Sequence, residues 1–237
     1  MTEVSEKDFK LLAQWDTPTI CNGLEIIDPK YASIGFTTQN MICSDPTLPP
    51  IVGFAKTATI RSRTPSTLSN TEQKKLNEEY YRHMAETPGP TISIIEDLDS
   101  PPGFGAWWGE VHTTIHQALG GLGVVTNGAI RDLDDCARGF QMLAGSIVPS
   151  HGYVHAVEVS TEVTVFSMTV RPGDIIHADQ HGAVVIPKHL LKGLPGAIEL
   201  LMNREGEILK AARTPQFTVD KLLNAMTNSK SIYQSGI

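Results

Sequence analysis

The sequence predicts an α/β fold in which helices cover a layered or barrel-like β core. A helix–strand unit occupies the middle of the chain (111–126), a series of short β segments follows it (154–187), and helical patterns stand near both ends. Because these apolar strands are too short to be stable alone, we expect them to pair in one sheet with helices packed against it.

Two helices are expected near the N-terminus. Ser5 and Asp8 have the spacing of a capping box for a helix over 5–14. Pro18 occupies a tolerated first position of a second helix that ends near Ile27. Residues 28–50 are rich in Pro, Thr, Ser and Asn, which predicts a loop with one short strand.

The central part of the chain is expected to alternate strands and helices. Gly120-Gly121 ends the helix over 111–119, and Asn127-Gly128 is expected to turn the chain after a short strand. The expected strands are 52–61, 91–96, 122–126 and 141–144, and the expected helices are 71–85, stopped by Pro88-Gly89-Pro90, and 132–138.

The C-terminal part changes from β to helical patterning. Four β segments are predicted at 154–160, 163–170, 174–179 and 182–187. Helices are predicted over 189–212 and 218–226. No repeat or low-complexity linker interrupts the order, so residues 1–237 are interpreted as a single domain.

Composition restricts the classes of function. The 237 residues carry a formal net charge of -7, and only short basic stretches occur, so no nucleic-acid partner is expected. The polar start and the lack of an apolar run of about 18 residues predict neither a signal peptide nor a membrane span. We therefore expect a cytoplasmic protein whose three separated cysteines are buried thiols.

Several common catalytic motifs are missing from the sequence, including the P-loop, the nucleophile elbow and the zinc-protease helix. His177, Asp179 and His181 alternate along one strand and could bind zinc, although Asp179 with Gly182 is also ordinary turn chemistry. His112 and His116 share one helix face, where they either bind a metal or pack.

The strongest candidate site combines Glu110 with the Arg131-Asp132 pair. A helix of about ten residues travels roughly 15 Å, and a return strand of about five residues covers roughly 17 Å. These three residues should therefore meet at one end of the helix–strand unit, beside the free N–H groups of a helix start, which attract anions. The alternative is a helix-dipole Glu with an unrelated surface Arg-Asp pair.

Glu110, twenty intervening residues and then Arg131-Asp132 resemble the acidic-x20-Arg-Asp motif of the RraA-like family, named for the regulator of ribonuclease activity A. The flanking GLGVVTNGAIRDLDD and the later VRPGDIIHADQHGAVVIP resemble the same family's signatures. The resemblance covers about residues 18–212 and implies a swivelling β/β/α core, with helical extensions at both ends. It also implies a homotrimer or a dimer of trimers.

This family contains metal-dependent aldolases that cleave 4-hydroxy-4-methyl-2-oxoglutarate and 4-carboxy-4-hydroxy-2-oxoadipate. The resemblance implies that Asp132 holds Mg2+ or Mn2+ and that Arg131 binds the 2-oxo acid and neutralises its enolate. Backbone N–H groups of the loop Gly109, Glu110, Val111 and His112 would bind the substrate carboxylate, and Glu110 would position a water. Glu205 is the candidate for a glutamate supplied by a neighbouring subunit.

The residue types suit this chemistry, because a metal and an arginine lower the barrier to a carbanion next to a carbonyl. We therefore expect a lyase that releases pyruvate, with possible oxaloacetate decarboxylase activity. The alternatives are a non-catalytic regulator like the ribonuclease inhibitor of this family, or the same enolate chemistry on another 2-oxo or sugar-derived acid. Glu110 departs from the aldolases, which commonly have Asp there, and Trp107 and Trp108 are expected in a substrate pocket or a subunit interface.

Overall fold

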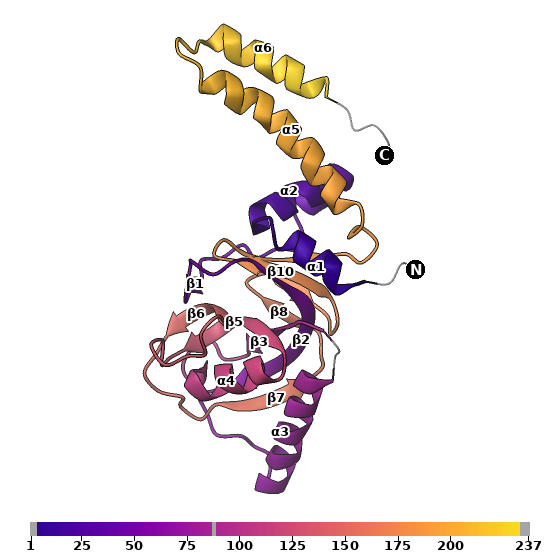
Figure 1. The fold of residues 1–237 in the computed structure, drawn as a ribbon. Coiled ribbons are helices and arrows are strands. Elements are labelled where there is room, and N and C mark those ends of the chain that lie inside the picture. The colour runs from indigo at the N-terminus through magenta and orange to yellow at the C-terminus, as the bar shows by residue number, and fades with distance from the viewer. Residues whose placement is uncertain (1–3, 87–88, 233–237) are drawn as a thin grey trace.

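The protein forms a curled β sheet with helices packed around it (Figure 1). The computed structural model describes residues 4–86 and 89–232. The helices are α1 (Glu6–Leu12), α2 (Thr17–Ile27), the 3-10 helix η1 (Pro29–Ala32), α3 (Asn70–Ala85), α4 (Glu110–Ala118), α5 (Leu194–Ala212) and α6 (Val219–Lys230). The predicted α/β fold is confirmed.

The strands build one nine-stranded sheet and one separate hairpin. They are β1 (Ile42–Cys43), β2 (Ile51–Arg61), β3 (Thr91–Asp97), β4 (Ala106–Trp108), β5 (Gly121–Ile130), β6 (Gln141–Ile147), β7 (His155–Val159), β8 (Val163–Val165), β9 (Met168–Val170), β10 (Ile175–Asp179) and β11 (Gly182–Ile186). The sheet order is β1-β6-β5-β3-β2-β10-β11, with β4 on β5 and β7 on β2.

The centre of the sheet is parallel. Strand β3 pairs in parallel with β2 and β5, and β5 pairs in parallel with β4 and β6. Strands β10 and β11 add an antiparallel section beside β2. Because the parallel strands share one carboxyl edge, the loops that follow β2 to β5 open on the same side, where α/β proteins place their ligands.

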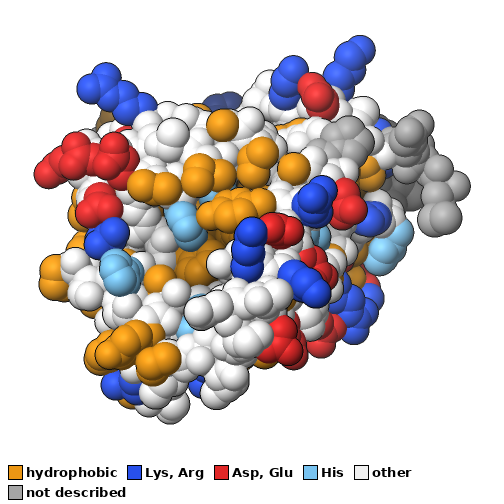
Figure 2. All heavy atoms as spheres, turned by 90° about the horizontal axis from the view of Figure 1, so that it is seen from below, with side chains coloured by type: hydrophobic (Ala, Val, Ile, Leu, Met, Phe, Trp, Pro, Cys, Tyr) orange, Lys and Arg blue, Asp and Glu red, His pale blue; other side chains and the backbone are white. Residues whose placement is uncertain are grey.

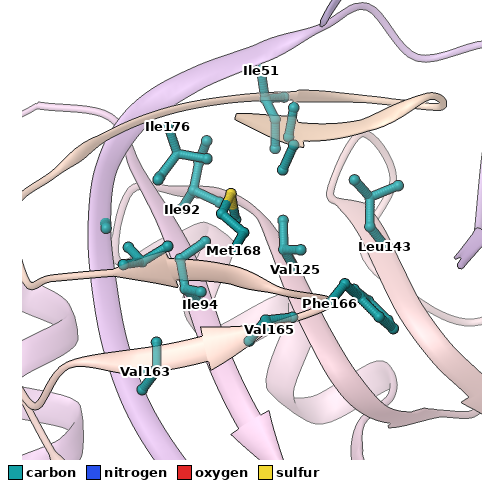
Figure 3. Close-up of a cluster of buried hydrophobic side chains, with 14 residues drawn as sticks. Ile51, Ile92, Ile94, Val125, Leu143, Val163, Val165, Phe166, Met168 and Ile176 are labelled. Atoms are coloured by element: carbon teal, nitrogen blue, oxygen red, sulfur yellow. The ribbon is translucent and has the colours of Figure 1, made fainter. Parts of the chain in front are cut away.

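The core is enclosed between the curled sheet and the β8–β9 hairpin (Figure 3). Ile92 and Ile94 from β3 contribute to it, and so do Val163 and Met168 from the hairpin, all at most 1% exposed. Two further apolar clusters pack on the outside of the sheet, one under α1, α2 and α5 and one under α3 and α4.

Helices α5 and α6 form an arm that extends away from the sheet, at the opposite end of the molecule from α4 (Figure 1). Its first turns are buried against α2, whereas the later turns carry exposed apolar side chains, among them Met202, Leu209 and Leu223. Within the described residues, no helix combines the length and the apolar character that a bilayer crossing requires.

Several local predictions are wrong. Asn127-Gly128 is not a turn but part of β5, where the register to β6 shifts between Thr126 and Ala129. Residues 132–138 form turns rather than a helix, and β4 has no counterpart among the expected strands. The segment 163–170 is two strands joined at Phe166-Ser167.

The predicted helix boundaries also differ near the C-terminus. Helix α5 begins at Leu194, because residues 188–193 form turns, and α6 continues to Lys230. The glycine stop after α4 is confirmed, since Gly120 has φ of +91°. The expected stop at Pro88 falls outside the described residues, although α3 does end at Ala85.

Candidate functional site

The start of α4 and the end of β5 lie together, as the chain-length argument predicts. The backbone N–H of Arg131 donates to the Trp108 carbonyl at 2.9 Å, which joins the residue after β5 to the end of β4. Gly109 lies between β4 and α4 and contacts both Arg131 and Asp132. The site is therefore made by two segments that are about twenty residues apart in the sequence.

Gly109 leaves room for the Asp132 carboxylate. A β-carbon on Gly109 would lie 2.5 Å from Asp132 Oδ2, so the carboxylate would have to move, and 3.2 Å from Arg131 Cγ, which is a tight contact. The φ angle of Gly109 is -169°, which any residue can adopt, so the close approach and not the backbone conformation requires glycine.

The first turn of α4 offers unpaired backbone donors. The first intrahelical bond is donated by Thr113 N to the Gly109 carbonyl at 3.0 Å, and Gly109 has no side chain to cap the helix. The N–H groups of Glu110, Val111 and His112 therefore precede the first intrahelical bond. Together with the positive end of the helix dipole, they favour a carboxylate or another anion.

The Arg-Asp pair presents opposite charges beside this helix start. Arg131 Nε lies 3.4 Å from Asp132 Oδ2, and the two side chains are 36% and 38% exposed. Asp132 has φ of +54°, a left-handed conformation that is strained for a non-glycine residue. This backbone conformation turns its carboxylate back toward Gly109, and both charges stay accessible to a ligand.

Thr113 fixes the loop that carries the pair. Its hydroxyl donates to the carbonyl of Gly109 at 2.9 Å and accepts the Ala137 N–H at 3.0 Å.

Burial raises the pKa of the nearby Cys136 thiol, and the negative charges of Asp132, Asp135 and Glu110 raise it further. Glu110 is exposed. Its negative charge therefore acts on the same thiol as the charge of Asp132.

Behind the helix start lies a cluster of aromatic and histidine side chains. His116 Nδ1 bonds to the His112 carbonyl at 2.6 Å, and its Nε2 bonds to the Tyr80 hydroxyl at 2.8 Å. Tyr80 also accepts the Trp107 indole N–H at 3.4 Å. This arrangement supports the packing interpretation of the His112–His116 pair.

Both histidines of this cluster are held neutral. Burial lowers the pKa of His112 to about 3, with smaller contributions from His116 and the positive charge of Arg131. Burial lowers the pKa of His116 to about 4. Trp108 is fully buried and stacks against Phe140, so it packs in the core, whereas Trp107 is half-buried against His112.

The His177–Asp179–His181 segment fastens the N-terminal helices to the sheet. His177 Nδ1 lies 3.0 Å from the Thr17 hydroxyl, and Asp179 accepts the Thr17 N–H at 2.8 Å and the His181 N–H at 2.8 Å. No group of three potential metal-ligating side chains is found in the described part of the chain. These contacts give His177 and Asp179 a structural role.

Sequence reasoning missed the part of Asn127. Its side-chain amide accepts the Asp97 N–H at 2.7 Å and donates to the Asp97 carbonyl at 3.0 Å. Asp97 is 3% exposed, and its carboxylate accepts the Gly103 N–H at 2.7 Å. Burial raises the pKa of Asp97. Asn127 thus holds the end of β3 to β5, a role that an Asn-Gly pair does not signal in a sequence.

Glu205 lies away from this site within one chain. It is exposed on α5, in the arm that extends from the opposite end of the sheet (Figure 1). The end of the molecule opposite the arm shows hydrophobic side chains between cationic, acidic and histidine side chains (Figure 2). The structure therefore brings together Gly109, Glu110, Arg131 and Asp132 but not Glu205.

The fold is an α/β sheet, and the candidate site is a helix start beside an Arg-Asp pair. Residues 17–185 match the family described as RraA-like, Aldolase/RraA. The chain belongs to the RraA-like family, which includes both aldolases and ribonuclease inhibitors.

One protein is similar to part of this chain in sequence. An uncharacterized protein of Methanocaldococcus jannaschii is 35% identical over 100 residues, which are 41% of this chain and 47% of that protein. The match therefore spans about half the length of this relative.

Two solved structures share the fold across most of their length. An uncharacterized protein from Pseudomonas syringae has a TM-score of 0.71 at 17% identity, covering 96% of both chains. Streptomyces coelicolor RraAS2, described as an unusual member of the RNase ES inhibitor RraA protein family, has a TM-score of 0.65 at 16% identity. It covers 90% of this chain and 100% of its own.

Proposed function

We propose that this protein is a divalent-metal-dependent carbon–carbon lyase that cleaves a 4-hydroxy-2-oxo acid and releases pyruvate. The observation that carries the proposal is the meeting of Gly109, Arg131 and Asp132 at the open start of α4. A cation, a carboxylate and free backbone donors are the groups that a 2-oxo acid and its enolate require. The family's aldolase members support this choice.

The residues present fit Mg2+ or Mn2+. Mg2+ keeps several waters and is commonly bound through one or two carboxylates together with substrate oxygens. Asp132 would supply one accessible carboxylate to the metal. The bound metal would act as a Lewis acid on the 2-oxo acid.

The remaining steps belong to residues of this chain. The N–H groups of Glu110, Val111 and His112 would hold the substrate carboxylate at the helix start. The Arg131 guanidinium would stabilise the negative charge that develops on the enol oxygen when the carbon–carbon bond breaks. Glu110 would position the water that returns a proton to the pyruvate enolate. Oxaloacetate passes through the same enolate, so this site would also decarboxylate it.

Glu205 would act on the site of a neighbouring subunit. Because the arm carries Glu205 away from its own α4, it would reach a site only across an interface. The exposed apolar side chains of the arm support self-association, which we propose as a homotrimer or a dimer of trimers. A cytoplasmic location is part of the same proposal.

Pyruvate release tests the activity. Lactate dehydrogenase would report pyruvate formed from oxaloacetate or 4-hydroxy-4-methyl-2-oxoglutarate in the presence of Mg2+, Mn2+ or EDTA. We expect metal-dependent release that falls roughly 10²- to 10³-fold in Arg131→Ala and Asp132→Asn. Arg171→Ala and Asp135→Asn are matched controls, since Arg171 pairs with Glu162 and Asp135 follows in the Asp132 loop. Undiminished turnover in Asp132→Asn would contradict the proposal.

Mixing of variants tests Glu205. If the glutamate acts across an interface, Glu205→Gln and Arg131→Ala subunits would be inactive alone and would recover activity when refolded together. A mixture as inactive as its components would remove Glu205 from the site.

Two other functions use the same fold. A non-catalytic role as a ribonuclease regulator draws on the inhibitor members of the family, of which Streptomyces coelicolor RraAS2 is described as one. Enolate chemistry on another 2-oxo acid or a sugar-derived acid would leave the roles of Arg131 and Asp132 unchanged. Absence of pyruvate release, together with capture of a ribonuclease by the tagged protein, would favour the regulator.

A further inference from the structure

A cavity of about 540 Å³ lies apart from the Arg-Asp pair. It opens between the β8–β9 hairpin, the end of β6 and the segment that precedes β1. Its volume is within the range of small-molecule sites. Asn127 on its wall precedes Arg131 by four residues, or roughly 13 Å of extended strand. Neither Arg131 nor Asp132 lines it.

The lining of this cavity is polar but uncharged. Among the described residues that line it there is no Lys, Arg, His, Asp or Glu, although charged residues make up 19% of the chain. Its polar members carry amides or hydroxyls and are Gln39, Asn40, Asn127, Ser146, Thr164 and Ser167. The Asn127 amide bonds to the Asp97 backbone, and the Ser146 and Thr164 hydroxyls bond to the Gly103 carbonyl and to Thr169. Gln39, Asn40 and Ser167 are therefore the groups that would serve neighbouring hydroxyl groups of a ligand, because amides and hydroxyls both donate and accept.

One wall of the cavity is aromatic. Phe166 is 7% exposed, and its ring lies at the margin of the core cluster (Figure 3). Thr38 N donates to the Phe166 carbonyl at 3.0 Å, which ties the hairpin tip to the segment that carries Gln39 and Asn40. A largely buried aromatic residue beside amides gives the lining both apolar and polar members.

The hairpin tip is strained in a way that the sequence could easily avoid. Phe166 and Ser167 have φ of +51° and +72° in the two-residue connection of β8 and β9. Such connections favour Asn-Gly because both positions need positive φ. The buried Phe166 also packs in the core, but Ser167 is exposed, so core packing does not account for the serine. Strained non-glycine positions cluster at ligand sites.

We propose that this cavity binds an uncharged polyhydroxylated molecule, such as a monosaccharide or a cyclic polyol. An anionic ligand would find no countercharge in the lining, and the Glu96 carboxylate, which accepts the Thr164 N–H at 2.8 Å, would repel it. The hydroxyl groups of the ligand would bond to the Gln39 and Asn40 amides and the Ser167 hydroxyl.

Ligand-observed saturation-transfer NMR on the full chain tests this assignment. D-glucose and myo-inositol are the neutral probes, and D-glucuronate keeps the pyranose ring of glucose but adds a negative charge. We expect transfer to the neutral probes at millimolar concentration and much weaker transfer to D-glucuronate. Equal transfer to D-glucuronate, or none to either neutral probe, overturns the proposal.

Two variants localise the binding. Gln39→Ala should weaken glucose binding about fivefold, the effect of one lost hydrogen bond, whereas Gln14→Ala on the far N-terminal segment should not change it. Ser167→Gly should weaken binding similarly while raising the melting temperature, because glycine relieves the positive φ. Unchanged binding in both Gln39→Ala and Ser167→Gly would overturn the site. These outcomes are independent of pyruvate release.

Discussion

Asp132 Oδ2 occupies the space that a side chain on Gly109 would need, at 2.5 Å from the position of its β-carbon. The start of α4 and the residue after β5 therefore constrain one another. The helix start approaches the carboxylate because it lacks a side chain, and the carboxylate reaches the helix start because Asp132 adopts a positive φ. This relationship makes the site sensitive to a single methyl group.

We expect Gly109→Ala to reduce turnover by at least about tenfold, because the methyl group displaces Asp132 and Arg131 from the helix start. Steady-state pyruvate release with each metal measures the effect. Gly193→Ala is the matched control, since its β-carbon would meet Ile27 Cδ1 at 3.4 Å, an ordinary contact. Equal activity of the two variants would show that the close approach has no part in catalysis.

The buried histidines make stability depend on pH. Burial lowers the pKa of His112 to about 3 and that of His116 to about 4, and burial with the charge of Lys56 lowers that of His83 to about 4. Below the unfolded-state pKa of about 6.5, the unfolded chain takes up protons that the folded chain does not. The free energy of unfolding should therefore fall as the pH decreases from about 6.5 toward 4.

Urea unfolding at several pH values measures this slope. Each histidine contributes at most about 1.4 kcal/mol per pH unit. His116→Gln should reduce the slope. A slope that His116→Gln does not alter would place the proton uptake elsewhere.

We expect Thr17→Val to destabilise the protein by about 1–3 kcal/mol, because the buried His177 Nδ1 loses its partner at 3.0 Å. The Thr17 N–H bond to Asp179 remains, so α2 should stay in place. Chemical denaturation measures the change. Thr64→Val, at an exposed position, is the comparison. An equal loss of stability there would argue against a specific role of the Thr17–His177 bond.

Asn127→Ala should lower the free energy of unfolding by about 1–3 kcal/mol. Both backbone groups of Asp97, at the end of β3, lose their amide partner in this variant. Asn127→Asp should be almost as costly, because a carboxylate facing the Asp97 carbonyl cannot donate. Thermal unfolding measures both. A fully stable Asn127→Asp variant would show that the donated bond is unimportant.

The sequence by itself determined most of the elements and the end of the helix–strand unit at which the site residues meet. Apolar periodicity and glycine stops identified α4 and the start of β5, and the length argument placed Glu110 at the same end as Arg131-Asp132, although β5 is twice as long as the predicted strand. These features are local, because hydrogen bonds within a helix and along a strand follow from the nearest residues.

Only the tertiary structure decided the rest. The Asn127-Gly128 pair has strong turn character, yet strand pairing on both sides of β5 holds it in a bulge, and its amide finds a partner thirty residues earlier. Of the histidines with metal-like spacing, His116 is a buried bonding partner of Tyr80 and His177 of Thr17, both of which lie far away in the sequence. Long-range partners satisfy buried polar groups, and local patterns in the sequence do not specify those partners.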